Sequence, residues 1–394
     1  MERKASRTRA FAVGAAVLVV AAAARSGVAG AAAPRRAAGD DRSFATGESS
    51  ESRDLVQARR LVDRSLGWLA ARVRSNGALE MTSAPQQPTI AATSLAILAF
   101  MAGGHTAEEG EDGHGARLRA LIHWLLGQAT LQECTCTRIA GPHLIGKFND
   151  PGFATSQMHG HGYATWAVAM ADGMSMGAQN VDSRERLKRT LQGAVHAIEL
   201  AQHSTGGWGY RLEAEKFHEG SVTVTVLQAL RSAKEAGMRV DPAVIAQAMK
   251  YLRDSQVRQA DDPRFGGFRY MLNDNLTSFA LTAAAVSSLN QAGDYDSKYV
   301  ELGIDYMRQK DPLVRFGVEP EQWPWYGRFY ATQAYWQYKE LRHFRGWYPA
   351  LVAAAERESR DGVYSDDLFG DVYATAMATL TLAVPFGYLP SFQR

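Results

Sequence analysis

Acidic and histidine side chains with spacings suited to proton transfer occur at two places in the chain. Asp366, Asp367 and Asp371 lie within six residues near the C-terminus, and His159 and His161 are separated by one residue. A carboxyl group and an imidazole can exchange a proton when the fold brings them together. We therefore expect His161 and Asp371 to form the candidate acid–base pair, with Asp366 as a third candidate catalytic residue.

The two cysteines, Cys134 and Cys136, are separated by a single residue. A disulfide suits an exported protein, but this spacing requires a tight loop, so free or reactive thiols are the alternative. His143, His159 and His161 are near in sequence, yet the spacing matches none of the regular zinc patterns. We expect no metal and no cofactor.

A repeated unit must position these residues. An amphipathic helix, a glycine-containing turn with a large residue, and an Ala/Thr-rich helix recur six times between about residues 55 and 390. The third copy, for example, reads "AVHAIELAQHSTGGWGY" and then "SVTVTVLQALRSAKEAG". The long segment from about residue 128 to 158 fits no repeat, and we expect it to be a lid over one mouth or a loop that binds a partner.

The two helices of each unit differ in the faces they can bury. In the first helix of the third copy, Leu187, Leu191 and Val195 form one stripe, whereas Arg184 and Lys188 face away from it. The second helices are apolar or small nearly all round, and "SVTVTVL" is interpreted as one of them despite its alternating letters. We predict an all-α (α/α)6 toroid, with an apolar inner ring and an amphipathic outer ring of helices.

The N-terminus is expected to be separate from this domain. Four basic residues precede an uncharged apolar run from Ala10 to Ala24, followed by small residues, which is the layout of an export signal over residues 1–31. An uncleaved anchor is the alternative, and it would be the only contact with a membrane. Residues 32–52 lack bulky apolar side chains and are predicted to be a disordered leader, so the toroid domain is expected at 53–394, in the periplasm or outside the cell.

The charge of the mature chain argues against a nucleic-acid partner. The whole chain carries +2 and its first 31 residues carry a net +4, which leaves about −2. The sequence contains no basic stripe.

One turn resembles a known repeat. Gln202-x-x-x-Gly206-x-Trp208 is similar to the Gln–Trp repeat of squalene and oxidosqualene cyclases, a family that includes protein prenyltransferase β subunits and has the α/α-toroid fold. The sixth copy has a weaker form that begins at Glu358. "MHGHGYAT", "GGWGY" and "GYLPSFQR" also resemble exported bacterial toroid proteins of undetermined activity. We expect the three motif residues to be structural, closing the end of the outer helix.

The resemblance does not bring the chemistry of these enzymes with it. Class II terpene cyclases protonate an alkene with the first Asp of Asp-x-Asp-Asp, and Tyr364 stands at that position here. The class I Asp-Asp-x-x-Asp motif fails at Gly370, with Asp371 one residue further on. Prenyltransferase zinc ligands lie on later repeats, whereas both cysteines here lie in the second.

The fold implies where a ligand would bind, because the N-termini of the inner helices direct partial positive charge towards one mouth of the toroid. The residues at and just before these helices define the candidate cavity: His159, His161, Tyr163, Tyr210, Glu219, Thr223, Asn273, Asp274, Tyr326, Arg328, Tyr330, Asp366, Asp367, Asp371 and Tyr373. The competing interpretation is structural: Asp274, Asp366 and Asp371 as helix N-caps, the histidines bound to loop backbone, and the aromatic rings packed in turns.

Three functions remain open. The first is an exported toroid that binds a small apolar ligand or a protein partner without chemistry, which the broken acid motifs favour. The second is an enzyme acting on an apolar isoprenoid-like substrate. The third is a carbohydrate-active α/α barrel with paired carboxylates flanking a sugar. We expect the centre of the toroid to discriminate between them, according to whether side chains fill it and whether acids converge there.

Overall fold

The computed structural model describes residues 44–108, 110, 113–135, 143–153, 155–173, 181–313, 321 and 323–393. The chain divides into residues Met1–Glu48 and the compact unit Ser49–Arg394. The expected export signal, and the leader up to residue 43, lie outside the described residues. Within the described residues, no helix is both long enough and apolar enough to cross a membrane.

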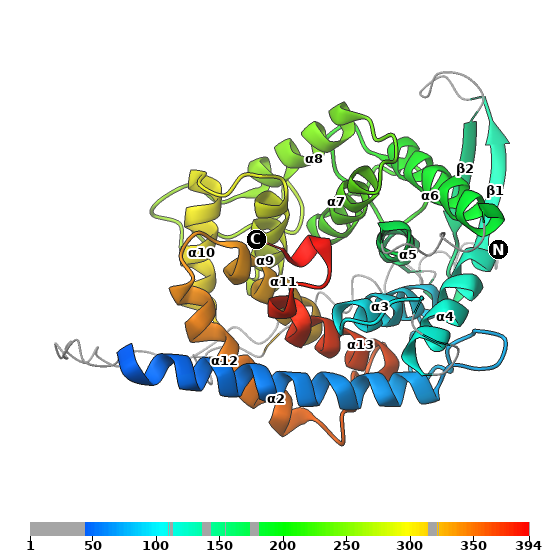
Figure 1. Ribbon diagram of the computed structural model, residues 1–394. Helices are drawn as coiled ribbons and strands as arrows, with labels where there is room; N and C mark the ends of the chain where they lie inside the picture. Colours follow the sequence, from blue (N-terminus) through cyan, green and yellow to red (C-terminus); the bar gives the residue numbers. More distant parts are fainter. Residues whose placement is uncertain are drawn as a thin grey trace, which may run out of the picture. The chain divides into compact units, whose positions relative to one another are not determined.

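The described α-helices follow one another as six pairs (Figure 1). The pairs are α2 (Phe44–Ala71) with α3 (Thr89–Ala102), α4 (His114–Gln128) with α5 (Gln157–Gly173), α6 (Val181–Ala201) with α7 (Gly220–Glu235), α8 (Pro242–Ser255) with α9 (Phe279–Gln291), α10 (Lys298–Lys310) with α11 (Pro324–Gln337), and α12 (Arg342–Glu358) with α13 (Asp371–Ala383). The predicted (α/α)6 toroid is confirmed.

The second helix of each pair belongs to the inner ring. Helices α3, α5, α7, α9, α11 and α13 each pack against the next, and α13 packs against α3 to close the ring. Nearly every residue of α3 is buried, because its sequence is apolar or small on all sides. Outer helix α8 instead buries Val244, Ala248 and Leu252 on one face and exposes Lys250. The two kinds of helix therefore sort into rings by how much of their surface they can bury.

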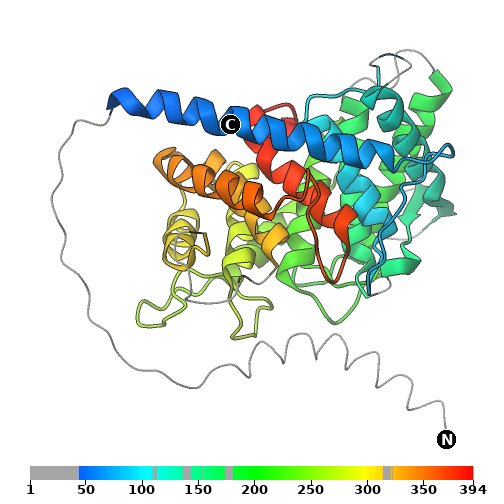
Figure 2. The ribbon, with the colours of Figure 1, turned by 90° about the horizontal axis from the view of Figure 1, so that it is seen from below.

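The first outer helix completes the outer ring. In Figures 1 and 2, α2 lies beside α12 and α13. Gln57 donates a hydrogen bond to Glu356 at 2.8 Å, and the Ser65 hydroxyl donates to the Gly362 carbonyl at 2.7 Å. These bonds link the first repeat to the sixth.

The best-preserved repeat motif joins two outer helices. The Gln202 amide donates to the carbonyl oxygens of Gly206 and of Val244, both at 2.9 Å, so it bonds its own turn and the start of α8. Gly206 has φ +96°, and a Cβ there would lie 2.2 Å from the Gln247 carbonyl oxygen. Only glycine fits this close approach without displacing α8.

Trp208 fixes the same turn to both helices of its pair. Its indole is fully buried and donates to the Ile198 carbonyl of α6 at 2.8 Å. Its backbone N–H donates to the Thr223 hydroxyl of α7 at 3.1 Å. These hydrogen bonds of Gln202 and Trp208 therefore hold the scaffold together.

The fourth repeat contains the same joint, although its first member, Gln256, was not expected from the sequence. The Gln256 amide donates to the Gly266 carbonyl at 3.1 Å and to the Tyr299 carbonyl at 2.8 Å, as Gln202 does in the third repeat. Phe268 takes the place of Trp208, and its N–H donates to the Thr282 hydroxyl at 3.1 Å. The insertion before Gly266 separates it from Gln256 in sequence but leaves the bonding unchanged.

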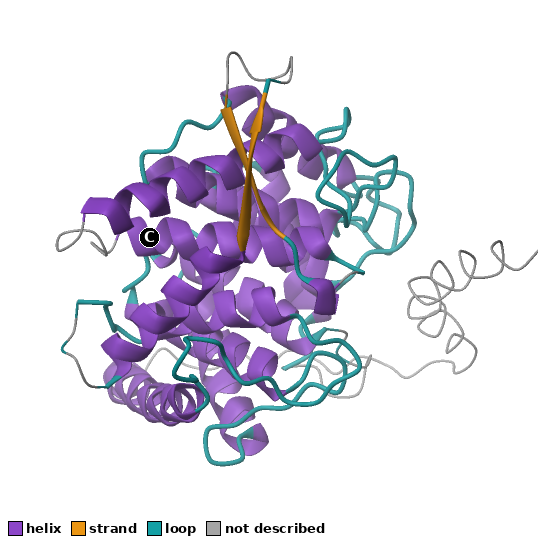
Figure 3. Ribbon diagram, turned by 90° about the vertical axis from the view of Figure 1, so that its right-hand side faces the viewer, coloured by secondary structure: helices purple, strands orange, loops and turns teal. Residues whose placement is uncertain are grey.

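The segment that fits no repeat forms a small hairpin, which was not expected (Figure 3). Strands β1 (Ala129–Cys134) and β2 (His143–Phe148) pair antiparallel, and β2 packs against outer helix α6. Gly146 and Gly193 permit this contact, since a Cβ on Gly193 would lie 2.9 Å from the Gly146 nitrogen. The hairpin therefore covers the outside of the ring, whereas Phe153 and Ser156, later in the same segment, lie beside His159 at the start of α5. Cys134 has a free thiol, and Cys136 lies outside the described residues.

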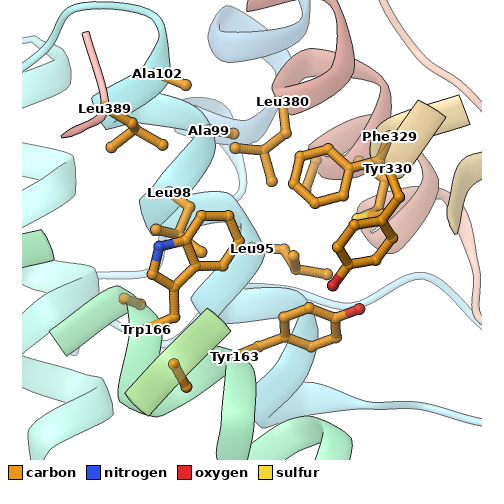
Figure 4. Close-up of a cluster of buried hydrophobic side chains, with 14 of the residues drawn as sticks. Leu95, Leu98, Ala99, Ala102, Tyr163, Trp166, Phe329, Tyr330, Leu380 and Leu389 are labelled. Carbon is orange, nitrogen blue, oxygen red and sulfur yellow. The ribbon is translucent and has the colours of Figure 1, made fainter. Parts of the chain in front are cut away.

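Side chains fill the middle of the ring. Figure 4 shows Leu95 and Leu98 of α3, Trp166 of α5, Phe329 of α11 and Leu380 of α13 converging on one another. All five are buried, with at most 1% of their surface exposed. The centre at this level is a packed core.

The C-terminal tail closes this core on the side where the inner helices end. Phe392, in the turn η3 (Pro390–Phe392), is fully buried, with its ring centroid 6.1 Å from Phe329 and 6.4 Å from Trp166. Trp336 donates to the Phe392 carbonyl at 2.8 Å, and Gln337 to the Ser391 carbonyl at 3.0 Å. The C-terminal tail therefore leaves a ligand the opposite face, where the inner helices begin.

Candidate functional site

Hydroxyl, imidazole and carboxyl groups gather at the N-terminal ends of the inner helices. We call this group the mouth cluster, and it consists of Ser156, His159, Tyr163, Tyr210, Glu219, Ser221, Tyr270, Tyr326, Tyr330 and Tyr373. Its members come from α5, α7, α11 and α13 and from the loops before α5, α7 and α9.

Glu219 anchors the cluster by capping α7. One carboxylate oxygen accepts from the Val222 N–H and the Ser221 hydroxyl at 2.7 Å each, and the other accepts from the Ser221 N–H at 2.6 Å. Glutamate is not among the preferred N-cap residues, and this one is fully buried. Burial raises its pKa to about 7, against the hydrogen bonds from Ser221 and Val222 that lower it.

His159 lies between two serines. Its Nδ1 pairs with the Ser156 hydroxyl, and its Nε2 lies 3.3 Å from the Ser221 hydroxyl oxygen. The Ser221 hydrogen is donated to Glu219, so Nε2–H of His159 is the donor to Ser221, and Ser156 donates to Nδ1. A directional chain therefore runs from Ser156 through His159 and Ser221 to Glu219. Burial lowers the pKa of His159 to about 4, so this chain is set for neutral imidazole.

Two tyrosines at equivalent positions of neighbouring repeats meet beside this chain. The hydroxyls of Tyr210 and Tyr270 form a hydrogen bond with each other. Their carbonyls accept from Met158 and Gly220, at the starts of α5 and α7, at 2.9 and 2.8 Å. Each loop is thereby fixed to the preceding inner helix. Burial, and next the Glu219 charge, raise the pKa of both phenols.

Further tyrosines extend the cluster towards the core. The Tyr326 hydroxyl donates to the Ser221 carbonyl at 3.4 Å, and its ring lies 4.7 Å from that of Tyr330. The hydroxyls of Tyr163 and Tyr330 point towards each other in Figure 4. Burial raises the pKa of Tyr163 to about 12, and it also raises the pKa values of Tyr326, Tyr330 and Tyr373 well above the usual range of a phenol. The phenols therefore stay neutral and can donate or accept hydrogen bonds.

The cluster suits recognition of polar groups better than metal chemistry. Among the described residues, no group of three or more His, Cys, Asp and Glu side chains is placed to hold a metal ion. Several members remain partly exposed although burial shifts their pKa values, namely His159, Tyr210, Tyr270 and Tyr326. Their hydrogen-bonding groups are therefore only partly shielded from solvent.

His161 is not part of this cluster. It is fully buried, its Nδ1 accepts from the Phe148 N–H at 3.2 Å, and its Nε2–H donates to the Ala194 carbonyl at 3.1 Å. Its ring therefore faces the hairpin and outer helix α6, where it fastens β2 to the toroid. The structure does not bring His161 to Asp371, so we abandon the expected acid–base pair.

The C-terminal acids organise a turn. One Asp366 oxygen accepts from the N–H groups of Leu368 and Phe369 at 2.9 and 2.8 Å. Asp371 is the first residue of α13 and the N-cap is Gly370, so the expectation of N-caps at Asp366 and Asp371 is wrong. Asp367 is exposed.

Asp274 is also part of a turn. Its carboxylate accepts from the Asn275 and Leu276 N–H groups, and Ser278 caps α9 through the Leu281 N–H. Asn273, beside it, is exposed. The expected N-cap at Asp274 is therefore wrong.

Two further expected site residues serve the scaffold. The Thr223 hydroxyl is buried between the Trp208 N–H and the Glu219 carbonyl. Arg328 binds Glu321 and Glu358 through two bonds each, at 2.6 to 3.0 Å. Burial alone would lower the pKa of the guanidinium, but these carboxylates raise it. Arg328 therefore ties the end of α12 to α11.

Several residues of this face were not expected from the sequence. Tyr270 could have been found, because "GGFRY" repeats "GGWGY" and places it where Tyr210 stands. Ser221 follows the cap residue but gave no signal of its own. Phe153, Phe369 and Trp323 lie in separate loops, and only the fold shows that their rings are neighbours.

Comparisons with known proteins support the fold. No protein-family pattern and no curated protein matches the sequence. Among solved structures, cellobiose 2-epimerase from Bacillus thermoamylovorans is 12% identical, covers 84% of this chain and 98% of its own, and has a TM-score of 0.54. The GH76A alpha-1,6-mannanase from Salegentibacter is 9% identical, with the same coverage and TM-score.

A terpene cyclase is similar to the same extent. Type II terpene cyclase MstE from Scytonema is 12% identical, covers 85% of this chain and 99% of its own, and has a TM-score of 0.53. Identities this low establish shared architecture and no shared chemistry. The chain is an α/α toroid, as its repeats and its resemblance to the cyclase family indicated.

Proposed function

We propose that this protein is an exported α/α toroid that binds a small ligand at the mouth cluster, without a catalytic role. The observation that carries the proposal is the contrast between the two ends of the ring. The C-terminal tail packs over one end, whereas partly exposed His159, Tyr210 and Tyr326 hold hydrogen-bonding groups at the other. Few, well-oriented polar groups among aromatic rings are typical of ligand sites.

The state of the acidic groups supports binding over catalysis. Glycoside hydrolysis uses two carboxyl groups that flank the substrate. Here both oxygens of Glu219 accept hydrogen bonds from α7, and Asp366 closes a turn. Alkene protonation needs an acid that can reach the substrate, and Tyr364 at the cyclase acid position is fully buried in the joint of the sixth repeat.

The packed centre favours a ligand held at the face. Leu98, Trp166 and Phe329 occupy the middle of the ring, so a long hydrocarbon chain would have to displace them to enter there. Export is supported by the basic and apolar pattern of residues 1–31. N-terminal sequencing of the secreted protein tests it, and a chain retained in the cytoplasm with residue 1 intact would refute it.

Small-molecule capture tests the binding proposal. Purified protein is incubated with aqueous and organic cell extracts, washed, denatured and analysed by mass spectrometry. We expect the wild type to retain a compound that Ser221→Phe does not, because a phenyl ring there would occupy the space between His159 and Tyr326. Ala246→Phe, on the exposed face of α8, is the matched control and should retain it.

A subtler variant guards against misfolding. Tyr210→Phe removes only the hydroxyl that pairs with Tyr270, and we expect it to retain less of the compound with an unchanged circular dichroism spectrum. Equal retention by Ser221→Phe, Tyr210→Phe and wild type, or no compound retained by any of them, would refute the mouth cluster as the site.

A further inference from the structure

A line of aromatic rings leads out from the mouth cluster to the surface. Its members are Trp323, Phe369, Phe153, His159, Tyr210 and Phe217. Ring centroids of successive members lie 6.2, 5.6, 6.5, 6.4 and 5.0 Å apart. They come from five different loops or helix starts, so the toroid, and no local sequence motif, brings them into contact.

The outer end of this aromatic line is unusual. Trp323 is 47% exposed and has φ +55°, a left-handed conformation that is uncommon for a bulky residue. An exposed tryptophan held in an unfavourable backbone conformation contributes little to the core. Such outliers concentrate at ligand sites, where the surrounding structure enforces them.

The polar groups beside the aromatic line restrict the class of ligand. The Ser156–His159–Ser221 chain and the phenols of Tyr210 and Tyr270 offer donors and acceptors within reach of the rings. A purely hydrocarbon ligand would cover these polar groups and offer them no hydrogen bond, which is unfavourable. A ligand with C–H faces and hydroxyl edges satisfies both kinds of surface.

Charge argues against a phosphorylated ligand. The mouth cluster contains Glu219 and no Lys or Arg, and Arg328 is bound to Glu321 and Glu358. A diphosphate would find no cationic partner among the members of the mouth cluster, and it would be repelled by Glu219 when that carboxylate is ionised.

We propose that the ligand is a linear oligosaccharide, whose sugar rings contact the partly exposed members of the aromatic line and whose outermost residue reaches Trp323. This inference rests on the proposed function, since it names the ligand class of the same site. The inner sugar occupies the mouth cluster near His159 and Tyr210. Phe153 is buried, but the line continues to the partly exposed Phe369 and to Trp323, so a tetrasaccharide contacts more rings than a disaccharide.

Calorimetric titration with defined sugars tests the proposal. The probes are cellobiose and cellotetraose, the di- and tetrasaccharides of α-1,6-linked mannose, and farnesol as the hydrocarbon alternative. We expect one tetrasaccharide to bind more tightly than its disaccharide. Trp323→Ala should weaken the tetrasaccharide by about tenfold, the scale of one aromatic contact, and leave the disaccharide unchanged, whereas Trp323→Phe should recover most of the loss.

The control and the refuting outcomes separate this inference from the proposed function. Tyr295→Ala removes an exposed aromatic side chain beyond the C-terminal end of α9 and should leave binding unchanged. Equal tetrasaccharide affinity of wild type and Trp323→Ala, or binding of farnesol alone, would overturn the oligosaccharide inference. Failure of both sugar series to bind would also overturn it, while the capture experiment with Ser221→Phe decides independently whether the mouth cluster binds a ligand.

Discussion

The buried cap of α7 makes the stability of the protein depend on pH in a defined direction. Burial raises the pKa of Glu219 from 4.5 to about 7 in the folded protein. The folded state therefore holds a proton on Glu219 between these pH values, whereas the unfolded state has lost it. Linkage then requires the free energy of unfolding to be higher below pH 4.5 and to fall as pH rises to 7, by about 3 kcal/mol at 1.4 kcal/mol per pH unit.

The substitution Glu219→Gln isolates this contribution. Urea unfolding of wild type and variant is measured between pH 4.5 and 8, and the difference in unfolding free energy is plotted against pH. His159 and His161, whose lowered pKa values change stability in the opposite direction, are present in both proteins and cancel. We expect wild type to lose about 3 kcal/mol relative to the variant across this range.

Asp241→Asn provides the control for a change of cap charge, because Asp241 caps α8 at an exposed position. Its difference from wild type should be nearly constant over the same range. The stability of wild type relative to Glu219→Gln could instead stay constant or rise with pH. Either result would show that the folded protein does not hold a proton on Glu219 in this range and would refute the reasoning.

Three further substitutions test the scaffold by chemical denaturation. Phe392→Ala should lower the free energy of unfolding by about 3–5 kcal/mol, because the ring is fully buried against the core. The exposed neighbour is the control, and Gln393→Ala should change stability by less than about 0.5 kcal/mol. Equal effects of the two substitutions would show that the tail does not pack on the core. Gly206→Ala should destabilise the protein more than Gly237→Ala, because the new Cβ would meet backbone at 2.2 Å at Gly206 and nothing within 4 Å at Gly237, although both glycines have positive φ. Gly237→Ala should cost about 1–2 kcal/mol. A larger loss for Gly237→Ala would show that Gly206 does not pack closely against α8. Arg328→Met should cost about 3–5 kcal/mol by leaving carboxylates without their partner, and an effect below about 1 kcal/mol would show that the ion pairs are weak.

The repeats made the architecture predictable. Local signals mark the helices, namely helical periodicity, Asp241-Pro242 at the start of α8 and Gly237 after α7. Each signal depends on only a few neighbouring residues, so it can be recognised without knowledge of the fold. The hairpin escaped this reasoning, because β2 is stabilised by contact with α6, nearly fifty residues away.

The site was only partly predictable for a related reason. His159, Tyr210, Glu219 and Tyr326 were expected near one mouth because all inner helices begin there, and the structure gathers them. His161 lies two residues from His159, but on a helix such neighbours point in different directions. Its orientation was decided by the strand that packs behind it.

The sequence by itself determined that helices pair, which member of each pair is buried all round, and where each turn needs glycine. These properties depend on the covalent chain and its local periodicity. Only the tertiary structure decided that the C-terminal tail packs over one end of the ring, that Arg328 faces Glu358, and that rings from five separate segments line up from Trp323 to Phe217. Such contacts join residues far apart in sequence, so they arise only once the ring has closed and brought the starts of its inner helices to one face.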